Sequence, residues 1–167
     1  MGAVLKALST LVPMASKHLD AVLTIETLAY EFPWSRGNFV DSLGAGHVAQ
    51  VLLGDHAEML GYLLALRGYQ ELHLLNLTVA PEFQGRGHAC HMLEWLVASC
   101  RQAGAQKLWL EVRESNSRAR HVYQRFGFAH IGTRKGYYPA AQSRREDAVV
   151  MGLPILPAQT ESHDAVE

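Results

Sequence analysis

The sequence predicts a mixed α/β fold of one domain, in which a mostly antiparallel sheet contains one central parallel pair of strands flanked by helices. Residues 72–104 have the pattern of an extended strand, a glycine loop and an amphipathic helix. Residues 107–113 then alternate apolar and polar side chains, as a half-buried strand does. Together they have the form of a βαβ unit, so we expect these two strands to be parallel neighbours joined by a right-handed crossover.

Ahead of this unit we expect one strand and two short helices. The largely apolar residues 3–12 predict the first strand. Serine side chains accept hydrogen bonds from the first N–H groups of a helix. We therefore expect Ser16 to cap a helix that ends near Leu28, and Ser35 to cap a second helix that ends at Gly44.

Two further strands should precede the central unit. Residues 47–53 and 58–67 are mostly apolar, and the Gly-Asp-His segment at 54–56 has the composition of a turn. With the strand at 72–79 they should form an antiparallel meander.

Within the central unit, a compact glycine loop precedes the helix. Pro81 ends the strand, and residues 84–89 follow as Gln-Gly-Arg-Gly-His-Ala. Gly85 and Gly87 have no Cβ atom, so the backbone can turn sharply there and approach a ligand closely. The apolar stripe of the helix ends before Gly104. Such a loop is typical of a phosphate site, although an ordinary strand–turn–helix connection has the same pattern.

The last third of the chain should contain one helix and two strands. A helix should begin at Asn116 and end at Gly127. We expect strands at 128–135 and 147–153, with a loop at 136–146 between them. The domain would then span residues 1–153, and residues 154–167, with two prolines and several acidic residues, would form a flexible tail.

The composition limits the functional class. Apolar residues make up 49% of the chain and the net charge is −1, which favours a globular protein and argues against direct nucleic-acid binding. No segment has the length of a membrane span or the pattern of a signal peptide. Cys90 and Cys100 fall on one predicted helix and point in different directions, so we expect two reduced thiols in a cytoplasmic protein.

Several motifs resemble a known superfamily. The spacing Gln84-x-x-Gly87-x-Ala89 resembles the Q/R-x-x-G-x-G/A acyl-CoA signature of the GNAT acetyltransferases, with alanine where many members carry glycine. Within this superfamily, three segments resemble the RimI-like branch, which acetylates the N-terminal alanine of a ribosomal protein. They are Phe32-Pro33-Trp34-Ser35, residues 108–113 and Tyr137-Tyr138-Pro139.

The resemblance implies acetyl-CoA as co-substrate and assigns residues to it. The pantetheine arm would contact Asn116 and the backbone of a strand that a bulge splays from its parallel neighbour, with the Val79 N–H polarising the thioester carbonyl. The residues expected to bind the cofactor are Leu77, Thr78, Val79, Gln84, Gly85, Arg86, Gly87, His88, Ala89 and Asn116.

The resemblance also implies two catalytic side chains. Glu111 matches the glutamate that acts as the base, although an exposed glutamate near a sheet edge would have the same pattern. Tyr123 matches the tyrosine that protonates the leaving thiolate, although the residue pattern alone favours a core tyrosine. His88 and His91 lie one helical turn apart, but no third ligand accompanies them, so we expect no metal.

The acceptor is expected to be a protein N-terminus, that of a small-subunit ribosomal protein. Phe32, Trp34, Tyr137 and Tyr138 would form the walls of the peptide groove. We expect a monomer or weak dimer without membrane contact. The alternatives are a lysine or small-molecule acetyltransferase and a CoA-binding regulator without catalysis. The presence of both Glu111 and Tyr123 argues against the regulator, which would need neither.

Overall fold

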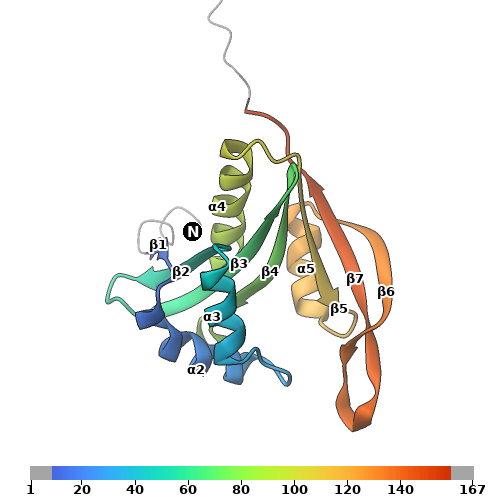
Figure 1. Ribbon diagram of the computed structural model, residues 1–167, viewed down its shortest axis with the longest axis horizontal. Coiled ribbons are helices and arrows are strands. Elements are labelled where there is room, and N and C mark those ends of the chain that lie inside the picture. The colour runs from blue at the N-terminus through green and yellow to red at the C-terminus, as the bar shows by residue number, and fades with distance from the viewer. Residues whose placement is uncertain (1–8, 159–167) are drawn as a thin grey trace, which may run out of the picture.

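The computed structural model describes residues 9–158, which form one seven-stranded sheet with helices on both faces (Figure 1). The strand order is β1-β2-β3-β4-β5-β7-β6, and only the β4–β5 pair is parallel. The strands are β1 Ser9–Pro13, β2 Val48–Gly54, β3 Met59–Gly68, β4 Glu71–Val79, β5 Lys107–Arg113, β6 Ala129–Pro139 and β7 Arg145–Pro154. The α-helices are α2 Leu19–Ala29, α3 Arg36–Gly44, α4 His88–Gln102 and α5 Ser117–Phe126, with 3₁₀ turns at Ser16–His18, Pro81–Phe83 and Ala141–Ser143.

The helices cover the sheet from two sides and create two cores. On one face, Met92 and Leu96 of α4 pack with Leu108 and Leu110 of β5. On the other face, α2 and α3 cover β2, β3 and part of β4, and the residues buried there include Val22, Phe39, Val51, Tyr62 and Leu64. Neither α2 nor α3 extends over β5, β6 and β7 (Figure 1). The Glu111 side chain lies on this face of β5, which α2 and α3 leave uncovered.

The predicted βαβ unit is confirmed, and a bulge divides its first strand. Ala65 pairs with Leu74 and Leu64 pairs with Asn76, so Leu75 has no partner on β3. Because side chains alternate along a strand, the extra residue lets Leu74 point into the α4 core and Asn76 into the α2 core.

The bulge coincides with the end of the parallel pairing. β4 pairs with β5 only from Glu71↔Lys107 to Leu74↔Leu110. Beyond Leu74 the two strands diverge, as the family resemblance implied. The edge of residues 75–79 that would face β5 therefore has no neighbouring strand.

The N-terminal helices match the prediction except at one cap. Ser35 caps α3, and its Oγ accepts the Asn38 N–H at 3.2 Å. The prediction that Ser16 caps a helix is wrong: Ser16 begins a 3₁₀ turn, and the His18 Nδ1 accepts the Ala15 N–H at 2.9 Å. No side chain caps either the 3₁₀ turn or α2, and the His18 ring binds only the N–H of the residue that precedes the turn.

The predicted loop at 136–146 is also wrong, because β6 and β7 extend through most of it. Tyr138 pairs with Glu146 and Pro139 with Arg145, which leaves a short connection. Gly136, at φ +57°, lies within a shift of register between Arg134 and Tyr138, so it marks a bulge in the strand and not its end. In Figure 1 this hairpin projects beyond the rest of the sheet.

The two chain ends are described in part. β1 begins at Ser9, and residues 3–8 of the predicted first strand lie outside the described residues. At the other end, Ile155 is buried and its N–H donates to the Gln106 carbonyl at 2.8 Å, so the chain is still packed just beyond β7. Residues 159–167 of the expected tail are not described. Between residues 9 and 158, none of the helices combines the length and apolar character that crossing a bilayer requires.

Candidate active site

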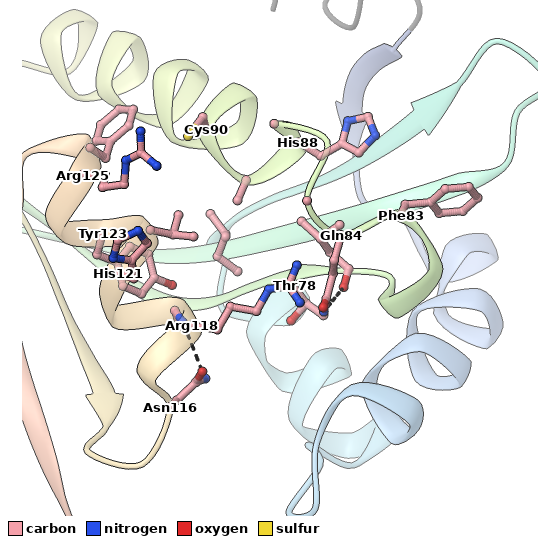
Figure 2. Close-up of a pocket in the computed structure, with 18 of the residues that line it drawn as sticks. Thr78, Phe83, Gln84, His88, Cys90, Asn116, Arg118, His121, Tyr123 and Arg125 are labelled. Carbon is pink, nitrogen blue, oxygen red and sulfur yellow. Dashed lines mark hydrogen bonds between the residues drawn. The ribbon is translucent and has the colours of Figure 1, made fainter.

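A cavity of about 760 Å³ lies where β4 diverges from β5. Figure 2 shows Thr78 and Gln84 on one side of it and Asn116 and Tyr123 of α5 on the other. The cavity brings together most of the residues predicted for the cofactor, namely Leu77, Thr78, Val79, Gln84, Gly85, Gly87, His88, Ala89 and Asn116. Its size suits a long, flexible ligand that would remain partly exposed to solvent.

The glycine loop forms the entrance to α4. Gly85 and Gly87 have φ +76° and +86°, values that residues with a Cβ atom rarely adopt. Gly87 is the N-cap residue, and no side chain caps the first N–H groups of the helix. These N–H groups and the positive end of the helix dipole suit a phosphate. Gln84 supports the loop, because its Nε2 donates to the Val79 carbonyl at 3.3 Å.

Two predicted members of the loop behave differently from the rest. Arg86 does not line the cavity, and its guanidinium lies 5.6 Å from the centre of the Phe83 ring. His88 is buried, and burial is the largest influence that lowers its pKa. The charges of His91 and Arg86 lower this pKa further. The ring is therefore neutral at neutral pH. Among residues 9–158, no group of three or more His, Cys, Asp or Glu side chains is arranged to hold a metal ion.

Tyr123 is buried in α5 and borders the cavity. Its ring packs edge-on against Phe128, with centroids 5.5 Å apart. Burial, followed by the proximity of Tyr30 and Tyr138, raises the pKa of Tyr123 well above its ordinary value. The phenol therefore carries its proton at neutral pH and can donate it. Asn116 caps α5, because its Oδ1 accepts the Ala119 N–H at 3.2 Å.

Glu111 lies on the opposite face of β5 from the apolar residues and does not line the cavity. It is the first residue of β5 beyond the pairing with β4. Only 7% of its side chain is exposed. Its Oε1 atom lies 3.3 Å from the His73 Nε2 and 3.7 Å from the Arg134 Nε. Neither of these contacts has the geometry of a hydrogen bond.

The environment of Glu111 favours its charged form. Burial alone would raise its pKa, but the side chains of His73 and Tyr137 and the charge of Arg134 together outweigh burial and lower it. The carboxylate is therefore ionised at neutral pH, as a base must be.

Three of the four predicted acceptor-groove residues gather near Glu111. Arg113 connects them: its guanidinium lies 5.0 Å from the centre of the Phe32 ring and 4.5 Å from that of Tyr138. It also forms an ion pair with Glu146 at 2.7 Å. Tyr137 contacts Tyr138, with ring centroids 4.9 Å apart.

Trp34 lies apart from this group. Its ring packs on Phe39 at 5.2 Å between centroids, and its backbone N–H donates to the Glu26 Oε1 at 3.0 Å. Its side chain thus belongs to the core under α3.

Sequence reasoning missed a buried polar network beneath the cavity. Glu26 of α2 is 1% exposed, and its Oε2 accepts from the Tyr62 hydroxyl at 2.5 Å and from Asn76 at 3.2 Å. Tyr30 lines the cavity, and its hydroxyl lies 2.7 Å from the Thr78 Oγ1. Burial, as the largest influence, raises the pKa of Tyr30 to about 12. Glu26 stands at helical spacing with the buried residues Leu19 and Val22, a signal that could have identified it.

Comparison with known proteins agrees with this geometry. A model of the Acetyltransferase (GNAT) family matches residues 19–128. The [Ribosomal protein bS18]-alanine N-acetyltransferase of Salmonella typhimurium is 36% identical over 148 residues, which cover 89% of this chain and 99% of the relative. The enzyme of the same name from Escherichia coli is 33% identical with the same coverage.

Solved structures give the same result. The crystal structure of the Escherichia coli ribosomal-protein-S18-alanine N-acetyltransferase matches with a TM-score of 0.82 and 32% identity, covering 93% of this chain and 98% of that one. Arabidopsis thaliana Naa50, in complex with the bisubstrate analogue CoA-Ac-MVNAL, matches with a TM-score of 0.74 at 19% identity, a likeness of fold alone.

Proposed function

The chain belongs to the GNAT family of acetyltransferases and is an acetyl-CoA-dependent N-acetyltransferase; we propose that its acceptor is the N-terminal alanine of a small-subunit ribosomal protein. The observation that carries this proposal is the similarity, at 33–36% identity along nearly the whole of both chains, to enzymes named for that reaction. The gathering of Phe32 and Tyr138 around Arg113, with Tyr137 in contact with Tyr138 and beside Glu111, supports it.

Acetyl-CoA would occupy the cavity between β4 and α5. The backbone N–H groups of residues 84–89, at the uncapped start of α4, would bind its phosphates. The pantetheine arm would follow the open edge of Leu77, Thr78 and Val79 toward Asn116. Arg86 would take part through its backbone only, since its side chain packs over Phe83.

The backbone of β4 supports a role for the Val79 N–H in polarising the thioester carbonyl. The next N–H along, that of Ala80, donates to the Leu60 carbonyl at 2.8 Å, toward β3. Because successive N–H groups point to opposite edges of a strand, the Val79 N–H points to the edge that β5 has left. A donor there could stabilise the oxygen as it gains charge.

Proton transfer would use the two predicted side chains. Glu111 would take a proton from the acceptor ammonium, and the amine nitrogen would then form a bond to the acetyl carbon as the carbon–sulfur bond breaks. Tyr123 would give its proton to the departing thiolate, and the second proton that the nitrogen loses as the amide forms would return to the Tyr123 phenolate through solvent. The low pKa of Glu111 and the raised pKa of Tyr123 leave each group in the protonation state that this assignment requires.

The amine that the enzyme acetylates, an α-amine or a lysine side chain, distinguishes this function from lysine acetylation. An α-amino group has a pKa near 8 and lysine near 10.4, so the neutral amine costs roughly 3 kcal/mol less to reach at the N-terminus. A peptide with a free N-terminal alanine should be acetylated on its α-amine, as found by mass spectrometry. The same peptide with a blocked N-terminus and an internal lysine should react far more slowly. Equal or faster reaction of the blocked peptide would assign the protein to lysine acetylation instead.

A further inference from the structure

His73 is held beside Glu111 by an aromatic contact. It lies on β4 and pairs in register with Trp109 of β5. The two rings are stacked, with centroids 3.7 Å apart and planes only 6° from parallel. This stacking fixes the plane of the imidazole, and its Nε2 lies 3.3 Å from the Glu111 Oε1. Because the two groups are not aligned as a hydrogen bond, direct transfer between them requires the Glu111 carboxyl group to rotate into line with the ring.

A base at the position of Glu111 has a difficulty that His73 could resolve. The carboxylate must release, in every turnover, the proton that it takes from the ammonium. Its side chain is 7% exposed, so its own access to water is limited, whereas the His73 side chain is 19% exposed. A neutral imidazole has one ring nitrogen with an acceptor lone pair, so Nε2 of His73 can take the proton from the acid form of Glu111.

The other groups around Glu111 cannot accept this proton. Arg134, at 3.7 Å, is always protonated and has no acceptor atom. Tyr137 approaches Glu111 as a hydrogen-bond donor, and that contact, followed by burial, raises the pKa of the phenol. On β4 itself the nearest titratable residue on the same face is Glu71, which contacts Gly68 at the far end of the strand.

Resting on the proposed role of Glu111 as base, we propose that His73 is a positioning and proton-relay residue of this acetyltransferase. The proton leaves the acceptor nitrogen and forms an O–H bond on Glu111. That bond then breaks as Nε2 of His73 gains the proton, and the ring, protonated at both nitrogens, gives the proton from Nδ1 to water. The carboxylate is restored by this step. Exchange of the ring protons with water, one gained at Nδ1 and one lost from Nε2, then returns His73 to the tautomer with a free Nε2 before the next turnover, and no oxidant or further reactant is needed.

The test compares His73→Ala, His73→Gln and Glu111→Gln, with His56→Gln as a control in the exposed turn between β2 and β3. Steady-state acetylation (kcat) of an alanine-starting peptide should be about tenfold slower or more in both His73 variants, less than the loss typical of a group that touches the substrate. The first turnover should be slowed less, because Glu111 is already deprotonated when it begins. The affinity for acetyl-CoA and the KM for the peptide should remain close to those of the unsubstituted protein.

Added imidazole separates a relay from a purely structural role. The Ala variant leaves space beside Trp109, so imidazole should restore its rate in a saturable manner, and it should not accelerate Glu111→Gln or His56→Gln. A loss that imidazole does not restore, or a His73→Gln rate equal to that of the unsubstituted protein, would overturn the relay. If Glu111→Gln itself kept full activity in the same assay, the assignment of the base would fail, and that outcome is distinct from a failure of His73 alone.

Discussion

The two halves of the site are built in different ways. The half proposed to bind acyl-CoA comes from the β4–loop–α4 unit and α5, and it offers mostly backbone: a strand edge, a glycine loop and an uncapped helix end. The half proposed to bind the acceptor comes from side chains that are far apart in the sequence. They are Phe32, His73, Glu111, Arg113, Arg134, Tyr137, Tyr138 and Glu146.

This difference determines how each half can fail. Backbone groups keep their hydrogen-bonding capacity under most substitutions, so the first half should be sensitive mainly where the chain conformation requires glycine. The second half depends on charge, because Glu111 is nearly buried and its pKa is set by its neighbours. Substitutions there should change rate and pH dependence while the fold remains intact.

The largest effect is expected from Gly87→Val, which tests the backbone half. Valine resists φ +86°, and its branched side chain would stand where the backbone should approach the phosphates. Loss of two hydrogen bonds to a charged group corresponds to an affinity for acetyl-CoA about a hundredfold weaker or more. Isothermal titration calorimetry measures this directly.

Gly46→Val is the matched control for this experiment. Gly46 has φ +75°, and a Cβ built on it meets nothing within 4 Å, so the strain is similar while the site is untouched. Its affinity for acetyl-CoA should be that of the unsubstituted protein. A folded Gly87→Val protein with normal affinity would show that the phosphates bind elsewhere.

Glu111→Gln should give the next largest effect and tests the side-chain half. A general base typically contributes about a hundred- to ten-thousand-fold to the rate. The variant should recover part of its rate as the pH rises toward 8 and neutral α-amine accumulates. Stopped-flow acetylation across this pH range measures both effects. Glu114→Gln, at an exposed residue just after β5, should leave the rate unchanged; full activity of Glu111→Gln would remove the residue from the mechanism.

Tyr123→Phe should have a smaller effect, although Tyr123 lies in the cofactor half. A thiol has a pKa near 8.5, so its thiolate can leave without full protonation at neutral pH. We therefore expect a loss of about ten- to a hundredfold, toward the low end for an acid catalyst, with the affinity for acetyl-CoA nearly unchanged. Tyr69→Phe, at a tyrosine that is 89% exposed, provides the control. If the acetyl-CoA affinity fell in parallel with the rate, the hydroxyl would be serving binding instead of proton transfer.

Sequence patterns predicted the backbone half well because that half is local. The strand at 107–113 agrees with the structure residue for residue, and Gly104 follows α4 at φ +71°. The bulge at Leu75 was predicted only from the family resemblance, because the alternation of side chains along this strand would also suit an uninterrupted strand. A shift of one residue in the register at this bulge would turn Asn76 away from Glu26 and into the opposite core.

The side-chain half was harder to predict because it depends on pairing between distant strands. Tyr137 and Tyr138 were expected in a loop, and the structure places them in β6, where pairing with β7 brings them beside Glu111 and Arg113. His73 occupies an alternating position in β4 with no local feature that marks it. Its role emerges only when β5 brings Trp109 and Glu111 next to it.

The smallest expected effect concerns stability against pH, and it compares the two halves directly. The pKa of Glu111 is lower in the folded protein than its ordinary value of 4.5, because His73, Tyr137 and Arg134 outweigh burial. A lowered carboxyl pKa means that the unfolded chain binds the proton more readily. The stabilisation from Glu111 is therefore fully present above pH 4.5 and is lost as the pH falls through the lower, folded-state pKa.

Urea unfolding of the unsubstituted protein, Glu111→Gln and Tyr123→Phe between pH 7 and pH 3 would test this. The difference in unfolding free energy between the unsubstituted protein and Glu111→Gln should be largest near neutral pH and shrink below about pH 4.5. The difference for Tyr123→Phe should stay constant over that range, because a phenol titrates near pH 10 or above and Tyr123 titrates higher still. A Glu111 difference that stayed constant or grew in acid would mean that burial dominates and that the carboxylate is not held in its charged form. The acceptor half would then lack the ionised base on which its proposed chemistry depends.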